Sequence, residues 1–479
     1  MRLPGFIGSS YTTPARVFDS QRTGNFYPEL SESGTSRNVA MLVRTPGLLQ
    51  IVATNGSEGR GMFTDMKSGR TFAVSGQQLF EITYPAGVWT ATLRGAVPGT
   101  QSISWASNGL QVVMATNGTP LYVLDLSTNV VSSPANAPIA SSVAFVDQYI
   151  IASVTGTARV QWSDLVDATS WNGLDFATAE AEPDNVVGMI ADHRELWIGG
   201  QQVMEVFRNT SDPSYVFGRV QSGLIQQGLM ARKSLVSLAN GVAWIGGDQR
   251  GGPVAYIAQG YAPSRVSTHA VEAAWSKYSR IDDAEAFEYV DDGHAFWVIS
   301  FPTADATWVY DATTGQWHER WWWETTPGRT RAIRGRFHTY AFGRHLVQDW
   351  ETGVIYEMSK AYLDDNGSKI RRLRSSPHVA DPERNVNVAY SKFELICSVG
   401  IGLDGGADDP QVILRFSNDG GYTWSNEIPC SVGPLGDYQR RVVWWRLGTA
   451  RDRVFEITMT DAVEWALIDA LIDFKPGED

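Results

Sequence analysis

Seven segments of the chain repeat one pattern: a short apolar stretch, a turn rich in glycine or polar residues, and a second apolar stretch. They begin at Phe72, Val112, Ile150, Leu196, Ala243, Phe296 and Tyr340. Short apolar stretches on both sides of such a turn are typical of β-hairpins. The pattern therefore predicts seven hairpins, with little helix between them.

These hairpins are regularly spaced. Equivalent apolar residues, Val74, Val113, Ile151, Trp197, Trp244, Trp297 and Tyr340, are separated by 39, 38, 46, 47, 53 and 43 residues. Propeller repeats of the common types are about 40–50 residues long, with one four-stranded blade each. A single blade cannot bury both of its faces, whereas a ring of blades can. We therefore predict a β-propeller of six or seven blades over residues 41–367. Unrelated hairpins in two sandwiches are the alternative.

The pattern changes near residue 365. Residues 362–376 are polar and turn-rich and then charged, as is common at a domain boundary. Several later segments alternate apolar and polar residues, which indicates half-buried strands. We predict a C-terminal β-sandwich over residues 368–479, so that the whole fold is all-β. Residues 1–40 are rich in Gly, Ser and Pro without a clear period, and we expect an extended N-terminal arm.

Charge and composition exclude several classes of protein. The chain has 52 acidic and 39 basic residues, a formal net charge of −13, whereas a protein that wraps DNA neutralises phosphates with basic side chains. It has only two cysteines, Cys397 and Cys430, too few for a secreted disulfide scaffold. The first ten residues lack the apolar core of a secretory signal, and no apolar stretch is long enough to span a membrane. We expect a protein made in a reducing cytoplasm, without membrane insertion.

The sequence lacks the common catalytic motifs. It has no G-x-S-x-G elbow, H-E-x-x-H pair, C-x-x-C pair or P-loop, and its seven histidines are scattered without metal-ligand spacing. We expect no catalytic residue, no cofactor and no metal site, and interpret the chain as a protein that is not an enzyme.

Clustered aspartates are the nearest approach to catalytic chemistry. They are Asp282 and Asp283, Asp291 and Asp292, Asp364 and Asp365, and the loop from Asp404 to Asp409. Paired carboxylates can hydrolyse glycosides, but aspartates beside glycines also cap the N–H groups of turns. We interpret these clusters as turns, with a calcium site in the Asp404–Asp409 loop as a weaker alternative.

One motif is specific. Ser417, Asp419, Gly421, Thr423 and Trp424 match the S-x-D-x-G-x-T-W Asp-box that recurs in sialidase-like propellers. The carboxylate can accept hydrogen bonds from turn N–H groups, the glycine can adopt positive φ, and the indole can pack on the hairpin. The box occurs once and outside the predicted propeller, so we interpret it as a structural hairpin and not as a sign of glycosidase activity.

Two clusters of aromatic and basic residues contrast with the acidic composition. Arg and Trp are enriched at binding hot spots, although a solvated charged face is an equal alternative. We predict both clusters as candidate interfaces, and any contact with DNA would be local and through phosphates. The first cluster is Trp321, Trp322, Trp323, Arg329, Arg331, Arg334, Arg336 and Arg344, and the second is Arg371, Arg372 and Arg374.

Both ends of the chain carry a family resemblance. LRFSNDGGYTWSNE from Leu414 and LGDYQRRVVWWRLGTARDRVFEITMTD from Leu435 resemble the end of the packaged DNA stabilisation proteins of short-tailed bacteriophages, also called tail accessory factors or tail nozzle proteins. NFYPE from Asn25 and RTPGL from Arg44 resemble the opening of that family. The resemblance implies a structural virion protein that forms a ring, typically of six copies, below the portal and its adaptor. Such a ring extends and closes the DNA channel and retains the packaged genome.

The resemblance also implies partners and a location. The partners are further copies of the chain, the portal-adaptor protein, tail fibre, spike or needle proteins, and DNA that passes transiently and non-specifically through the channel. The location is the virion tail, assembled in the host cytoplasm. The alternative function is a carbohydrate-binding or sialidase-like propeller in receptor recognition, because the Asp-box and the 17 Tyr and 18 Trp would suit sugars. A concave pocket with converging carboxylates and arginines at the propeller mouth would favour that alternative.

Overall fold

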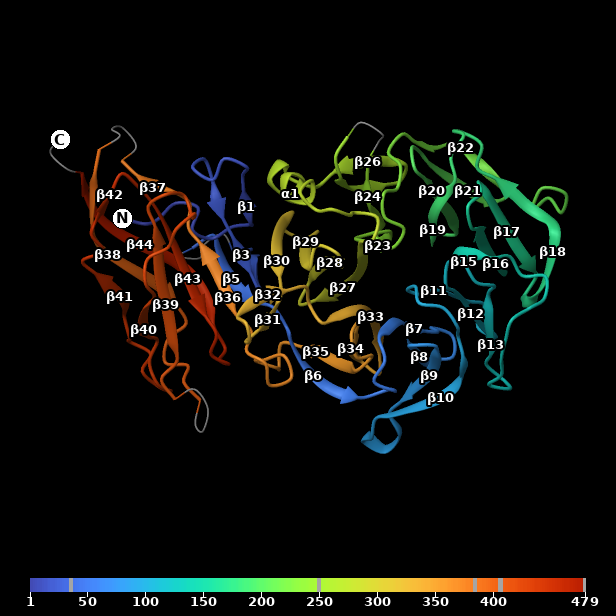
Figure 1. The fold of residues 1–479 in the computed structure, drawn as a ribbon, viewed down its shortest axis with the longest axis horizontal. Helices are drawn as coiled ribbons and strands as arrows, with labels where there is room; N and C mark the ends of the chain where they lie inside the picture. The colour runs from blue at the N-terminus through green and yellow to red at the C-terminus, as the bar shows by residue number, and fades with distance from the viewer. Residues whose placement is uncertain (34–37, 248–250, 382–385, 404–407, 477–479) are drawn as a thin grey trace.

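The computed structural model describes residues 1–33, 38–247, 251–381, 386–403 and 408–476. Figure 1 shows a ring of small sheets beside a second part that contains both chain termini. Helix in the described residues is limited to α1 (His269–Trp275) and the 3-10 turn η1 (Pro85–Gly87). None of the helical segments described is long and apolar enough to cross a membrane.

The ring contains seven four-stranded antiparallel blades within the described residues. Blades one to three are β7 (Gly59–Thr64), β8 (Thr71–Ser75), β9 (Gln78–Thr83), β10 (Thr90–Ala96); β11 (Ser104–Ser107), β12 (Gln111–Ala115), β13 (Tyr122–Asp125), β14 (Val131–Ser132); and β15 (Ala140–Val146), β16 (Tyr149–Val154), β17 (Arg159–Asp164), β18 (Asp167–Thr178). Blades four and five are β19 (Val186–Asp192), β20 (Glu195–Gly200), β21 (Met204–Asn209), β22 (Phe217–Ile225); and β23 (Val236–Leu238), β24 (Gly241–Gly246), β25 (Val254–Gln259), β26 (Ala262–Arg265). Blades six and seven are β27 (Glu285–Asp291), β28 (His294–Phe301), β29 (Ala306–Asp311), β30 (Gln316–Arg320); and β33 (Gly335–Ala341), β34 (Arg344–Asp349), β35 (Ile355–Ser359) with β6 (Gly47–Val52). Each predicted hairpin supplies the second and third strands of one blade, and the count agrees with the predicted six or seven.

Burial between blades explains why the ring closes. Seven hydrophobic clusters of the described residues each join two neighbouring blades, and one of them joins the seventh blade to the first. In that cluster, Leu346 and Ile355 of blade seven pack with Phe80 and Ile82 of blade one. A ring leaves no blade with an uncovered apolar face, which an open row of blades would have.

The seventh blade takes its outer strand from the other end of the chain. β6 pairs antiparallel with β35, with Gly47 opposite Ser359 and Val52 opposite Ile355. Gly47 must be glycine-sized, because a Cβ there would lie 2.4 Å from the carbonyl oxygen of Asp364. The pairing gives the last blade its fourth strand and ties the beginning of the propeller to its end.

The second part is a β-sandwich. One sheet has the order β4 (Phe26–Leu30), β5 (Ala40–Arg44), β44 (Ala466–Pro476), β38 (Val388–Cys397), β41 (Val442–Trp445), with β42 (Thr449–Ala450) beside β38. The other contains β36 (Arg372–Ser375), β43 (Asp452–Met459), β39 (Gln411–Ser417) and β40 (Ile428–Ser431), with β37 (Val379–Ala380) beside β43. The sheets enclose one core, built around Phe393, Trp444, Phe455 and Trp465. A propeller followed by a C-terminal sandwich in an almost all-β chain confirms the predicted fold class.

The first 44 residues connect the two parts. β3 (Thr23–Gly24) lies between β30 of blade six and β36 of the sandwich, so that one 10-stranded sheet runs through both. β4 and β5 add to the other sandwich sheet, and β1 (Tyr11–Thr12) and β2 (Ser20–Gln21) form a separate hairpin. The boundaries expected at residues 40 and 367 stay predictions.

Candidate functional site

The centre of the junction between propeller and sandwich is a contact between a glycine and a tryptophan. Gly24 in β3 pairs in parallel with Glu319 of β30 and antiparallel with Leu373 of β36. The Trp321 ring covers Gly24 so closely that a Cβ there would lie 1.5 Å from a ring carbon. The indole N–H of Trp321 donates to the carbonyl of Arg371 at 2.8 Å. Trp321 is therefore buried between the two parts of the same chain.

Asn25 completes this contact. Its side-chain amide donates to the carbonyls of Trp321 and Arg371, each at 3.0 Å, and its side-chain oxygen accepts from the backbone N–H of Trp321 at 3.1 Å. Asn25 adopts a φ of 52°, a left-handed conformation that asparagine tolerates better than most residues. The residue thus binds the backbone of both parts at once.

Two arginines of the second predicted cluster are fully buried in the same region. The guanidinium of Arg374 donates to the carbonyls of Phe6 at 2.6 Å and Gly5 at 2.9 Å, and to the Thr23 hydroxyl at 2.8 Å. Arg372 donates to the carbonyls of Asp461 and Leu363, both at 3.1 Å. Burial lowers the pKa of Arg374 to about 9 and that of Arg372 to about 10. Arg374 therefore holds the N-terminal segment in place, whereas Arg372 binds backbone of the domain boundary and of the sandwich.

The first predicted cluster is also largely engaged within the chain. Trp322 and Trp323 lie in β31 (Trp322–Glu324), which pairs with β32 (Arg329–Arg331). Each arginine faces a carboxylate: Arg329 faces Glu324, Arg331 faces Asp305, Arg334 faces Asp349, Arg336 faces Glu285 and Arg344 faces Glu357. Arg371 stacks on the Trp323 ring at 4.8 Å. Trp321 and Trp323 bring the two clusters into contact through Arg371, whereas Arg336 lines a pocket with residues of blades one and two and Arg344 stacks on Tyr84. Arg329 is the most exposed of these five arginines.

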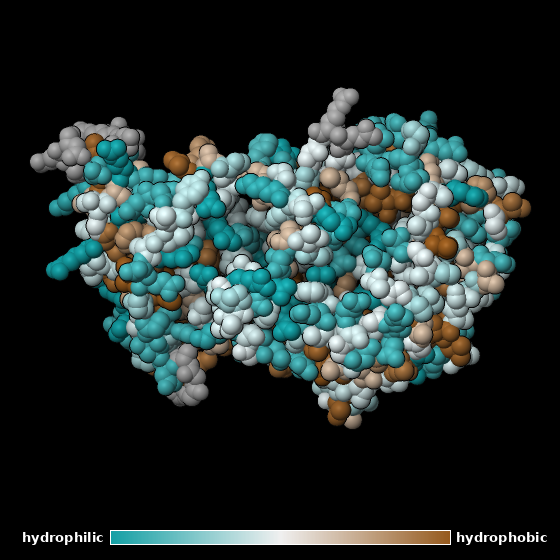
Figure 2. Space-filling view, in the orientation of Figure 1, coloured by the Kyte–Doolittle hydropathy of each residue, from teal (hydrophilic) through white to brown (hydrophobic). Residues whose placement is uncertain are grey.

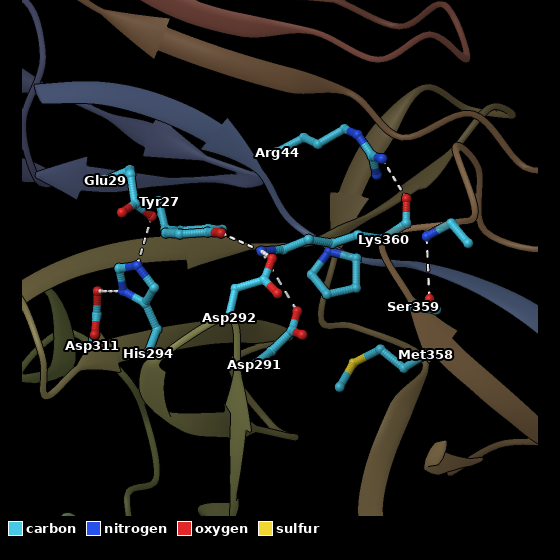
Figure 3. A network of polar contacts seen from close by, with 12 residues as sticks. Tyr27, Glu29, Arg44, Asp291, Asp292, His294, Asp311, Met358, Ser359 and Lys360 are labelled. Carbon is cyan, nitrogen blue, oxygen red and sulfur yellow. Dashed lines mark hydrogen bonds and ion pairs between the residues drawn. The ribbon is translucent and has the colours of Figure 1, made fainter. Parts of the chain in front are cut away.

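A polar network beside the junction joins three regions of the chain (Figure 3). The Lys360 ammonium, just after blade seven, donates to the Tyr27 hydroxyl of β4 at 2.5 Å and to Asp292 of blade six at 2.7 Å. Arg44 of β5 donates to the Lys360 carbonyl and forms an ion pair with Glu464 of the sandwich at 2.6 Å. Burial works to lower the pKa of Lys360, but Asp292 and Tyr27 raise it above its ordinary range.

His294 forms the other half of this network. Its ring nitrogens lie 2.7 Å from Asp311 of the same blade and 2.7 Å from Glu29 of β4. Burial works to lower the pKa of His294, but hydrogen bonds and charge from Asp311 and Glu29 raise it above the ordinary value of 6.5. The imidazolium form therefore connects the sandwich strand to the propeller through two carboxylates.

The Asp-box residues form a tightly hydrogen-bonded turn after β39. Asp419 accepts from the backbone N–H groups of Tyr422 and Thr423, both at 2.9 Å, and from the hydroxyls of Ser417 and Thr423, both at 2.6 Å. Gly421 has a φ of 92°, and the Arg415 guanidinium lies 4.6 Å from the Trp424 ring centroid. The four hydrogen bonds hold the pKa of Asp419 well below its usual range.

One mouth of the propeller contains a cavity of about 460 Å³. Arg232, Lys233, Asp282, Asp283 and Glu285 are among its lining residues. Its charged groups bind one another or the backbone: Asp282 accepts two hydrogen bonds from Arg280, and Lys233 donates to the Ile103 carbonyl. Burial lowers the pKa of Lys233 to about 7. The cavity is concave and lined by charged side chains. Arg280, one of its arginines, is ion-paired with Asp282 at 2.7 Å.

The other aspartate pairs lie in turns. Asp292 and Gly293 connect β27 to β28 with φ values of 49° and 83°, and Asn366 and Gly367 follow Asp365 with φ values of 51° and 84°. No group of three or more metal-ligating side chains occurs in the part of the chain that the structure describes. Residues 404–407 of the loop considered for calcium lie outside that part.

Little in the sequence predicts the junction residues. Glu29 lies 265 residues before His294 along the chain, and the contact of His294 with Glu29 and Tyr27 depends on where β4 docks. Asparagine tolerates a left-handed conformation, so the Gly24–Asn25 pair weakly indicates a turn. Asn25 enters the sequence-based prediction only as the first residue of the NFYPE segment.

Comparison with known families gives two matches. A family model described as "Bacteriophage P22 Gp10, beta-propeller" matches residues 1–362, and one described as "Bacteriophage P22 Gp10, beta-sandwich" matches residues 374–475. The two matches follow the same order as the two parts of the structure. No curated protein sequence matches the chain.

Several solved structures resemble the chain distantly. A chain of the mitotic checkpoint complex is 12% identical, with a TM-score of 0.40, over 69% of this chain and 96% of that chain. The extracellular domain of BT4673 from B. thetaiotaomicron is 10% identical, with a TM-score of 0.43, over 66% and 39%. PorZ, a surface component of the type-IX secretion system of Porphyromonas gingivalis, is 11% identical, with a TM-score of 0.38, over 81% and 46%. This chain spans less than half of the last two, and similarities this low give no indication of function.

Proposed function

Because this chain belongs to the family of bacteriophage P22 Gp10, the packaged DNA stabilisation and tail hub proteins of short-tailed phages, we propose that it forms a ring that closes the DNA channel of the tail. Membership makes the chain a structural component of the phage tail. The proposal adds that the ring lies on the tail axis below the portal-adaptor protein, extends the channel, and retains the packaged genome. The observation that carries it is the match of both family models, in order, over nearly the whole chain.

The rigid junction supports this role. A subunit that holds a closed channel against packaged DNA must not bend between its two parts. Here one sheet continues from blade six through β3 into the sandwich, and Arg374 and Asn25 bind backbone from distant segments. Interfaces between domains allow relative motion unless they are large and well packed. A rigid body with fixed contact surfaces suits rotational assembly.

The ring is proposed to be a hexamer assembled in the host cytoplasm, with the portal-adaptor above and tail fibre, spike or needle proteins as further neighbours. Arg329 and Arg344 are the more accessible members of the predicted interface, and we retain them as candidate lateral contacts. The acidic composition suits transient DNA passage, because tight phosphate binding would oppose exit. No catalytic role is proposed.

The experiment is to assemble phage particles without this protein. We expect them to package DNA and then to lose it, so that the genome becomes accessible to added nuclease. Prompt addition of purified protein should restore nuclease resistance. Particles that keep their genome without the protein and fail only in attachment to the host would contradict the retention role.

Receptor recognition is the second candidate, and the cavity at the propeller mouth favours it. Carboxylates and basic side chains line this cavity, whose volume is about 460 Å³, as in many ligand sites. The pairing of Arg280 with Asp282 argues against a free arginine set. Binding of host surface glycans by purified protein, abolished by Asp283→Asn and Arg232→Gln, would support this candidate over the tail ring.

A further inference from the structure

Two cavities lie inside the propeller, among the first strands of the blades, which Figure 1 shows around its centre. The cavity at the mouth has a volume of about 460 Å³, and a smaller one has a volume of about 140 Å³. Lys233 and Glu285 line both, so the cavities adjoin, and we call them together the central channel. Figure 2 shows hydrophilic residues around the middle of the propeller in the same view.

The walls of the central channel carry buried polar atoms without a hydrogen-bond partner. In the part of the chain that the structure describes, they are Thr155 Oγ1, Asp283 Oδ1, Glu285 Oε2, Trp105 Nε1 and Arg336 Nε. Arg336 Nε lies 3.6 Å from Glu285 Oε2, which is longer than a hydrogen bond. Buried polar groups in proteins almost always bind protein or ordered water. The channel therefore suits small polar molecules.

Lys233 crosses this channel. Its backbone carbonyl accepts from the Ala286 N–H of blade six at 2.9 Å, whereas its side-chain nitrogen donates to the carbonyl of Ile103, which leads into blade two. The neighbouring Arg232 guanidinium donates to the Ser141 carbonyl of blade three at 2.6 Å. Two adjacent basic side chains thus extend from the beginning of blade five to the far side of the ring, where backbone carbonyls hold them.

The surroundings of Lys233 favour its uncharged form. Burial and the adjacent charge of Arg232 outweigh the attraction of Glu285, so the pKa of Lys233 falls to about 7. At Lys360 burial acts in the same direction, but Asp292 and Tyr27 outweigh it and raise the pKa. At pH 7 about half of the Lys233 side chains are therefore neutral amines, whereas ordinary lysines are almost all protonated. A desolvated neutral amine next to a second cation is an activated nucleophile.

The other titratable groups of the channel walls do not neutralise this pair of basic residues. They are Arg280, Asp282, Asp283, Arg336 and His338. Arg280 and Asp282 form an ion pair with each other at 2.7 Å. Burial lowers the pKa of His338 to about 3, so that its ring is uncharged at pH 7. Among the described residues, neither Lys233 nor Arg232 has an ion-paired carboxylate, and each is bound through a backbone carbonyl.

From this arrangement we propose that the central channel is a covalent modification site, where Lys233 condenses with a small aldehyde or ketone that carries a carboxylate. Arg232 binds the carboxylate, because guanidinium groups bind carboxylates through two parallel hydrogen bonds and Arg232 has five N–H donors. The Lys233 nitrogen forms a bond to the carbonyl carbon. Both amine protons leave with the carbonyl oxygen as water, and an imine remains, so the step needs no oxidant or reductant. The inference goes beyond the tail ring and applies to a single copy of the chain.

The test uses the purified full chain, with glyoxylate as the probe and sodium cyanoborohydride to reduce the imine to a stable carboxymethyl group. After brief treatment at pH 7, peptide mass spectrometry should show Lys233 modified about ten-fold more than the exposed Lys67 and Lys277. The preference should shrink as the pH rises towards about 10, where exposed lysines also lose their proton. The wild type carries this test, so the result does not depend on the folding of a variant.

A second arm tests the carboxylate. Arg232→Gln should lower the modification of Lys233 by glyoxylate more than its modification by acetaldehyde, which has no carboxylate. Arg451→Gln, at an exposed position in the sandwich, is the control and should change neither. Equal loss with both probes would overturn the proposed class of ligand, and Lys233 modified no more than Lys277 at pH 7 would overturn the site. Neither result bears on genome retention, which is tested with particles that lack the protein.

Discussion

Individual buried cations near the junction differ in what stabilises them. Arg374 has lost water without gaining a carboxylate within hydrogen-bonding distance, and its guanidinium is satisfied by backbone carbonyls, a hydroxyl and an amide. His294 lies between two carboxylates instead. Burial opposes the charged form in both and lowers the pKa of Arg374. At His294 the two carboxylates outweigh burial, so its pKa rises. The distinction determines how each residue responds to pH.

His294 should make the junction sensitive to pH. Because its pKa is raised above 6.5 in the folded chain, its stabilisation is complete below pH 6.5 and is lost as the pH rises through the raised value. We expect the difference in melting temperature between wild type and His294→Gln to be largest below pH 6.5 and to shrink as the pH rises. His269→Gln, at a highly exposed position, serves as the control. A difference that grows with pH would contradict the assignment.

Asp419 should contribute to stability and not to chemistry. Asp419→Ala removes the acceptor for two backbone N–H groups and two hydroxyls. A lost hydrogen bond lowers the free energy of unfolding only slightly where water can replace the acceptor. A buried donor left without an acceptor lowers it by about 1–3 kcal/mol. Because this turn is exposed, we expect the free energy of unfolding to fall by about 1 kcal/mol, measured by chemical denaturation. Glu427→Ala, an exposed carboxylate in the same loop, should change it by much less.

Single elements show what the sequence could and could not predict. The hairpins β8–β9 and β20–β21 were predictable because apolar stretches flank turn residues such as Gly76, whose φ is 54°. The pairing of β6 with β35 was not, since it joins segments about 300 residues apart and depends on ring closure. Trp321 and Arg374 were predicted as candidate interface from residue type alone. Residue type cannot say whether the surface they bind belongs to the same chain, and here they are buried within it.

The contact between propeller and sandwich should depend on β3, which lies between β30 and β36. In Gly24→Ala the new Cβ would overlap the Trp321 ring, and forcing apart a packed contact costs about 1–3 kcal/mol, occasionally more. We expect a lower melting temperature and faster proteolytic cleavage between the two parts. Gly173→Ala is the matched control, because a Cβ there meets nothing within 4 Å. Equal effects of the two substitutions would contradict the role of this contact.

The molecule as a whole should unfold as one unit because its two parts share the N-terminal segment. Arg374 lies in the sandwich strand β36 and binds backbone carbonyls of Gly5, Phe6 and Ser9. Farther along the same N-terminal segment, β3 pairs with β30 of blade six. Arg374→Met leaves those carbonyls without their donor, and buried groups left without a hydrogen-bond partner cost about 1–3 kcal/mol each. Calorimetry should therefore show one transition for wild type and two for the variant, as the sandwich melts before the propeller. Arg329→Met, at an exposed ion pair, should keep the single transition, because surface substitutions usually change stability by about 0.5 kcal/mol or less.

Two transitions in the wild type would mean that the propeller and the sandwich unfold independently and are joined only by the chain. In that case the subunit could bend at its junction, and the rigidity that supports genome retention would be lost.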